Sequence, residues 1–107
     1  MTFQSKLQES DIDRFFKAIL LLQNEEECYR FFEDVSTVAE LKALAQRLQV
    51  AEMLLNNETY SNIATVTGAS TATISRVKRC LNYGSDGYQL ILKRLRESDK
   101  DILPQKK

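Results

Sequence analysis

The 107-residue sequence contains no histidine, one proline, three glycines and two cysteines. Without histidine, and with Cys28 and Cys80 far apart and outside any CxxC pair, neither a common zinc site nor a disulfide framework is expected. No nucleophile stands beside a plausible base in the sequence, so we expect no enzymatic activity and no metal or cofactor. The two thiols are predicted to be reduced and mostly buried.

Long hydrophobic runs are missing as well. No stretch approaches the roughly 18 apolar residues of a membrane span, and the N-terminal MTFQSKLQESD lacks the charged-then-apolar order of a secretory signal. With 43% hydrophobic and 28% charged residues, the chain fits one small globular domain. We therefore predict a cytoplasmic protein with no membrane partner, comprising one domain over residues 1–98 and a polar, frayed tail over residues 99–107.

Apolar residues recur at helical rather than strand spacing, which predicts an all-α fold. Ser10, Asn24 and Thr37 are each followed three residues later by an acidic residue, the pattern of a helix N-cap. The third helix is the longest and ends at the pair Asn56–Asn57. Its predicted apolar face comprises Leu41, Leu44, Leu48, Ala51 and Leu55. A last helix has its predicted apolar face at Tyr88, Ile91, Leu92 and Leu95.

The predicted helices carry apolar residues on more than one face. The excess includes Leu20, Leu21, Leu22, Val50, Met53 and Leu54. A second copy of the chain could cover this surface, and a tightly packed monomer with a large core is the alternative. We favour a homodimer over such a monomer.

Charge is unevenly distributed, although the formal net charge is zero. Residues 1–58 contain six cations and eleven anions, whereas residues 59–107 contain nine cations and four anions. The stretch from Thr59 to Tyr83 contains no acidic residue and includes Arg76, Lys78 and Arg79. A surface built from it could approach phosphate groups without like-charge repulsion, unless the clustering is due to chance.

The same stretch has the spacing of a helix-turn-helix over residues 59–82. Thr59 caps a short helix with Ile63 and Val66 facing inward, Gly68 forms the turn, and Ser70 or Thr71 caps a second helix. Ala64, Ile74, Val77 and Leu81 supply the packing between the two helices. An ordinary helical hairpin with a glycine corner could show similar spacing.

With the branched residues of the second helix buried, small polar residues and cations remain on its outer face. Small residues permit close entry into the major groove, and arginine can bind guanine or phosphate. The predicted DNA-binding residues are Ser70, Thr71, Ala72, Thr73, Ser75, Arg76, Lys78 and Arg79. Lys93, Arg94 and Arg96 on the last helix are interpreted as an ordinary solvated face.

From about Thr37 to Glu97 the chain resembles the Trp repressor superfamily, and over its whole length the YerC/YecD-type group of Trp-repressor-like proteins. The resemblance rests on AQRLQVAEMLLNNETYSNIATVTGASTATISRVKRCL, with the long third helix, the GASTATISR corner and the terminal helix in the same order. It implies an intertwined all-α homodimer whose two helix-turn-helix motifs meet successive major grooves of double-stranded DNA.

The resemblance also implies an effector pocket, in which Thr37, Arg47, Thr73 and Arg76 match positions that hold tryptophan in tryptophan-binding members. At the next position those members have glycine, where this chain has Val77, and Cys80 replaces a serine. The valine methyls would fill the space for the indole, at a cost of roughly 1–3 kcal/mol for any accommodating shift. We expect that tryptophan is not the corepressor and that any other effector is unknown.

Together these features predict a sequence-specific DNA-binding transcriptional regulator, a repressor by its resemblance, associated with the nucleoid of a bacterial cytoplasm when bound to DNA. The alternative is a dimeric helical protein-interaction module without specific DNA binding. Such a module would use the apolar excess and the acidic N-terminal half to bind its partner.

Overall fold

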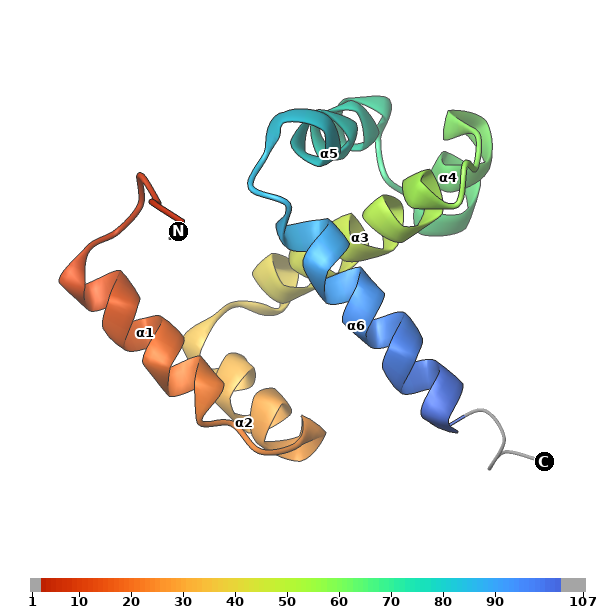
Figure 1. Cartoon of the computed structure of the whole chain (residues 1–107). Helices are drawn as coiled ribbons and strands as arrows, with labels where there is room; N and C mark the ends of the chain where they lie inside the picture. The colour runs from red at the N-terminus through yellow and green to blue at the C-terminus, as the bar shows by residue number, and fades with distance from the viewer. Residues whose placement is uncertain (1–2, 103–107) are drawn as a thin grey trace. The chain divides into compact units, whose positions relative to one another are not determined.

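The structure is a computed structural model that describes residues 3–102, with side chains up to residue 99. Within this range it contains six helices and no strand, which confirms the predicted all-α fold (Figure 1). The helices are α1 (Ser10–Leu20), α2 (Glu25–Val35), α3 (Val38–Leu55), α4 (Tyr60–Thr67), α5 (Thr71–Tyr83) and α6 (Gly87–Ile102). The chain divides into two compact units, residues 1–38 and residues 39–107.

The first unit contains the hairpin of α1 and α2. Asn24 caps α2 as predicted, because its side chain accepts a hydrogen bond from the backbone N–H of Glu27 at 2.9 Å. The prediction that Ser10 caps α1 is wrong: the N-cap is Glu9, whose side chain makes no cap hydrogen bond, and Ser10 is the first helical residue. The rings of Phe15 and Phe31 join the two helices at a centroid distance of 5.9 Å.

The second unit has a compact core formed by α3, α4, α5 and α6. In Figure 1, α4 lies at the C-terminal end of α3, α5 lies above α3, and α6 crosses in front of its N-terminal half. The buried residues are Val50, Ala51 and Leu54 of α3, Ile63 of α4, Ala69 of the turn, Ile74 and Val77 of α5, and Leu92 of α6. Each helix of this unit therefore contributes at least one buried side chain to the same cluster.

Several predicted burials differ from the structure. On α3 the buried side chains include Val50 and Leu54, whereas Leu44 and Leu55, both assigned to the apolar face, are 51% and 40% exposed. Val66, predicted to face inward, is 54% exposed. The prediction of buried thiols is wrong, since Cys28 and Cys80 are free and exposed. Exposure of a cysteine depends on its place on the helix, which residue type alone does not reveal.

The structure describes the first four residues of the predicted C-terminal tail, 99–102. Helix α6 continues past residue 98 to Ile102, so the first residues of the predicted tail are helical. Residues 103–107, the rest of that tail, lie outside the described residues. The division into one domain over residues 1–98 stays a prediction.

Candidate nucleic-acid interface

Helices α4 and α5 form the predicted helix-turn-helix, close to the expected range of 59–82. Thr59 begins α4: its side chain accepts a hydrogen bond from the N–H of Asn62 at 3.1 Å. Gly68 ends α4 in the left-handed conformation, with φ of 75°, and its N–H donates to the carbonyl of Ala64 at 2.9 Å. Glycine is favoured here because a Cβ at positive φ is strained.

The turn between the two helices is held by side-chain hydroxyls. Thr67 Oγ1 donates to the carbonyl of Ile63 at 2.7 Å and accepts from the N–H of Ala69 at 3.0 Å. Ser70 Oγ accepts from the N–H of Thr73 at 3.1 Å, which identifies Ser70 rather than Thr71 as the N-cap of α5. Because Ala69 is also buried, the corner is fixed by packing as well as by hydrogen bonds.

One face of α5 is buried and the opposite face is exposed. Ile74 and Val77 are 0% and 1% exposed, and Leu81 is half-buried beside the core. Of the predicted DNA-binding residues, the exposed ones are Ser70, Thr71, Ala72, Ser75, Arg76, Lys78 and Arg79. Thr73 is half-buried, and its hydroxyl accepts a hydrogen bond from Ser70 Oγ at 3.1 Å. The structure thus places seven of the eight on accessible surface.

Helical spacing arranges these exposed residues in a definite order. Ala72, Ser75 and Arg79 lie opposite the buried face, while Lys78 lies at one margin of the exposed face and Arg76 at the other. Neither α4 nor α5 has an acidic residue in its first turn. Within the described residues, the three cations of α5 form no ion pair. Their charges are therefore available to an anionic partner.

A second group of side chains lies at the Arg76 margin of α5. The pKa of Tyr88 on α6 is raised by its burial and by the Cys80 thiol, and lowered by the nearby cations Arg47 and Arg76. These effects place Arg47 of α3, Arg76 and Cys80 of α5, and Tyr88 of α6 in one neighbourhood. Tyr88 is the member that sequence reasoning missed, because its spacing assigned it to the apolar face of the last helix.

Five of the six predicted effector residues lie in the second unit. Arg47 and Thr73 are half-buried, while Arg76 and Cys80 are exposed. Val77 belongs to the hydrophobic core of the second unit. Thr37, the remaining predicted member, belongs to the first unit.

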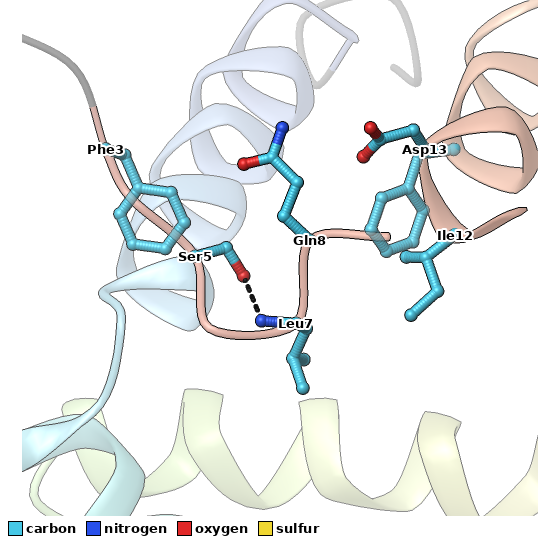
Figure 2. Close-up of a pocket in the computed structure, with 7 residues that line it drawn as sticks. Phe3, Ser5, Leu7, Gln8, Ile12 and Asp13 are labelled. Atoms are coloured by element: carbon cyan, nitrogen blue, oxygen red, sulfur yellow. Dashed lines mark hydrogen bonds between the residues drawn. The ribbon is translucent and has the colours of Figure 1, made fainter. Parts of the chain in front are cut away.

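A different hollow occurs in the first unit, with a volume of about 200 Å³ (Figure 2). It is lined by Phe3, Ser5, Leu7, Gln8, Ile12, Asp13 and Phe16. Ser5 Oγ accepts a hydrogen bond from the N–H of Leu7 at 3.0 Å, which closes the short turn at its edge (Figure 2). The lining contains no cation and none of the predicted effector residues.

The described residues contain no group of three His, Cys, Asp or Glu side chains that could hold a metal ion. Among the same residues, no helix has the length and apolar character needed to cross a membrane.

Comparison with known proteins gives a consistent assignment. The family model described as Trp repressor protein matches residues 10–96. The chain is 55% identical over 96 residues to the uncharacterized protein YerC of Bacillus subtilis (strain 168), covering 90% of this chain and 92% of YerC.

Two solved structures are similar. One is a proposed Trp repressor from Staphylococcus aureus, with a TM-score of 0.82 and 54% identity over 85% of this chain and 91% of that one. The other is a TrpR-like protein from Eubacterium eligens ATCC 27750, with a TM-score of 0.81 and 53% identity over 84% of this chain and 93% of that one. The chain belongs to the Trp repressor family.

Proposed function

We propose that this protein is a sequence-specific regulator of transcription, acting as a repressor, that binds double-stranded DNA as a homodimer in the bacterial cytoplasm. Family membership points to a DNA-binding regulator rather than an enzyme. The observation that carries the finer proposal is the exposed face of α5, where small residues and unpaired cations lie together on a helix fixed by its buried side.

Helix α5, the reading helix, has the chemistry that entry into a major groove requires. Ala72 and Ser75 are small enough to allow close approach, and hydroxyl groups can pair with several base edges. Arg79 lies on the same face and can bind guanine or phosphate. Arg76 and Lys78 flank this face on its two sides, where phosphate contacts would fix the register of the helix on the duplex.

The homodimer is supported by the surface of the first unit. Neither α1 nor α2 has a buried residue. Leu20 and Leu21 are 82% and 76% exposed, and Tyr29 is 62% exposed. A hairpin of this size has too little core to be stable alone. If the α1–α2 hairpin of a second copy packed against this hairpin, these side chains would be buried. The resulting homodimer would contain two reading helices.

The proposal excludes tryptophan as the corepressor. Val77 is 1% exposed and packs in the core, so its methyl groups occupy space rather than line a cavity. An indole ring could enter only by displacing that packing. The prediction is tested by adding L-tryptophan to the protein and measuring both its melting temperature and its DNA affinity. A rise in either would contradict this part of the proposal.

The DNA-binding function is tested by selecting genomic fragments with the purified protein at near-physiological salt and with competitor DNA. We expect a palindrome whose half-site centres lie about 34–36 Å apart, one helical turn. Arg76→Ala with Arg79→Ala should abolish selection and leave the melting temperature nearly unchanged. Failure of the wild-type protein to enrich any sequence would favour the alternative of a protein-interaction module.

A matched control separates the reading helix from general charge. Arg14→Ala with Lys17→Ala also removes two exposed cations, but from α1. This pair should retain sequence selection. If both double variants lose binding to the same extent, the contribution of α5 is only its charge, and the assignment of base-reading residues is wrong.

A further inference from the structure

We propose that Gln46 and Gln89 are positioning residues that set the orientation of the reading helix α5 on the helices that carry it. The inference rests on the proposed DNA-binding function. Gln46 Nε2 on α3 donates to the carbonyl of Thr67 at 3.1 Å. Gln89 Nε2 on α6 donates to the carbonyl of Leu81 at 2.8 Å. Both hydrogen bonds are part-buried and both connect different helices.

Both acceptors lie at the C-terminal ends of the helix-turn-helix helices. Thr67 is the last residue of α4, and Leu81 lies in the last turn of α5. The carbonyls of a last helical turn have no partner within their own helix, so they can accept from a neighbour without breaking the helix. Each glutamine therefore bonds a carbonyl that the local backbone leaves free.

The two bonds restrain the motif at two separate points. One holds the corner between α4 and α5, and the other holds the far end of α5. Hydrogen bonds depend on direction as well as distance, whereas apolar contact does not. A tilt or roll of α5 about its packed face could keep Ile74 and Val77 buried, but it would lengthen or bend at least one of these two bonds.

The bond from Gln46 also reaches the start of the reading helix. Its acceptor, Thr67, is the residue whose hydroxyl bonds Ile63 and Ala69. Ala69 directly precedes the cap Ser70. Holding the Thr67 carbonyl therefore holds the corner from which α5 begins.

The environment of Gln89 indicates that this residue orients α5 and does not add to the stability of the fold. Its Oε1 atom is buried and has no hydrogen-bond partner within the described residues. A buried acceptor without a partner is unfavourable, and an apolar side chain of similar length would avoid that cost. What an apolar replacement cannot supply is the directional bond to Leu81.

The test uses Gln46→Met, Gln89→Met and the double variant, with Gln49→Met as control. Gln49 is an exposed residue of the same helix α3 as Gln46. Affinity for the selected operator and for unrelated DNA is measured at one salt concentration. In the double variant we expect operator affinity to fall about tenfold, the scale of one lost base contact, because base contacts need closer alignment than phosphate contacts. Affinity for unrelated DNA and the melting temperature should stay nearly unchanged.

A second measurement, made without DNA, accompanies the affinity measurements. NMR residual dipolar couplings of backbone amides report the orientation of α5 relative to α3 and how much that orientation varies. We expect the couplings of α5 to change in the methionine variants and to stay unchanged in Gln49→Met. If Gln89→Met does not fold, Gln89→Leu and the single Gln46 variant provide the same comparison.

The outcomes distinguish this inference from the function on which it rests. If the wild-type protein selects no operator, the proposed function fails, and the dipolar couplings alone decide whether the glutamines orient α5. The inference is overturned if the wild-type protein selects an operator and the methionine variants keep two properties unchanged. These are the ratio of operator affinity to affinity for unrelated DNA, and the residual dipolar couplings of α5. The inference is also overturned if the affinity for the operator, the affinity for unrelated DNA and the melting temperature all fall together. That result would show that the glutamines only stabilise the fold.

Discussion

The two units of the chain differ in how they bury apolar side chains. Among the described residues of the second unit, which contains the helix-turn-helix, eight are buried, and four helices and the turn contribute them. The first unit has two amphipathic helices joined by contacts such as Phe15 with Phe31, yet neither helix contains a buried residue. The helix-turn-helix unit therefore has a core within one chain, whereas the hairpin has exposed apolar side chains and no buried residue.

Under the proposed function, this difference corresponds to two tasks in one small protein. A helix that reads DNA must keep a fixed orientation, and a core contained within one chain provides that rigidity. A surface that associates with a second copy must remain accessible until the copy arrives. Changes in the second unit should accordingly alter stability at any protein concentration, and changes on the hairpin should alter mainly association.

The largest effect is expected from Ile74→Ala. Ile74 is fully buried in the cluster that fixes α5, and truncating such a side chain costs about 2–5 kcal/mol. Urea denaturation should show this loss at both low and high protein concentration. A loss below 1 kcal/mol would contradict the assignment of Ile74 to the core.

The next effect concerns the hairpin. Leu20→Ser with Leu21→Ser should raise the dimer dissociation constant at least a hundredfold, about 2.7 kcal/mol, because each buried leucine contributes about 1.5–3 kcal/mol. Sedimentation equilibrium measures the change. Val66→Ser, at another exposed apolar side chain but in α4, is the control and should leave association unchanged. Equal dimerisation of all three proteins would show that the hairpin is not the interface.

A smaller effect is expected at the corner of the helix-turn-helix. Gly68→Ala should cost roughly 1–2 kcal/mol, because an alanine at φ of 75° is strained even though nothing lies within 4 Å of the added Cβ. Gly87→Ala is the matched control, since Gly87 also has open space but no positive φ and begins α6. It should be neutral or slightly stabilising. Thermal denaturation of the two variants gives the comparison.

The N-caps provide the fourth comparison, again between the two units. Ser70→Ala removes the side-chain cap of α5 and should cost about 1 kcal/mol. Ser10→Ala changes a serine that the sequence predicts to be a cap but that lies inside α1, and it should be nearly neutral. Denaturant unfolding of both variants checks the pair. If Ser10→Ala lowered the free energy of unfolding more than Ser70→Ala, Ser10 would be the N-cap of α1, as the sequence predicts.

These comparisons show which features the sequence could predict. The caps at Asn24, Thr59 and Ser70 and the turn at Gly68 depend on neighbours within four residues, so a local pattern identifies them. The α1 boundary was missed because Glu9, which offers no cap hydrogen bond, nevertheless has the extended backbone of an N-cap.

The remaining errors have a different origin. Which face of α3 is buried depends on where α4, α5 and α6 pack, so Leu44 and Val50 could not be ranked from spacing alone. Contacts between distant segments of the chain give a role to Tyr88, Gln46 and Gln89. No short-range signal in the sequence marks them, whereas the exposed residues of α5 follow directly from helical periodicity.

The smallest expected effect is a pH dependence that arises at Tyr88 in the second unit. Burial raises the pKa of Tyr88 above its usual value near 10, further helped by Cys80 and opposed by Arg47 and Arg76. A raised pKa in the folded state means that the unfolded chain releases this proton first. The contribution of Tyr88 to stability is therefore complete below about pH 10 and is lost as the pH rises through the folded-state value.

Replacement by phenylalanine isolates this contribution. Urea denaturation of Tyr88→Phe should show a weaker decline of the free energy of unfolding above about pH 10 than the wild-type protein shows. Tyr83→Phe, at a tyrosine that is 81% exposed in the same second unit, is the control and should retain the wild-type decline. If the free energy of unfolding depended on pH in the same way in all three proteins, the hydroxyl of Tyr88 would be exposed to water and not buried. The expected difference would instead show that burial, the largest cause of the raised pKa, keeps the hydroxyl of Tyr88 protonated in the folded second unit.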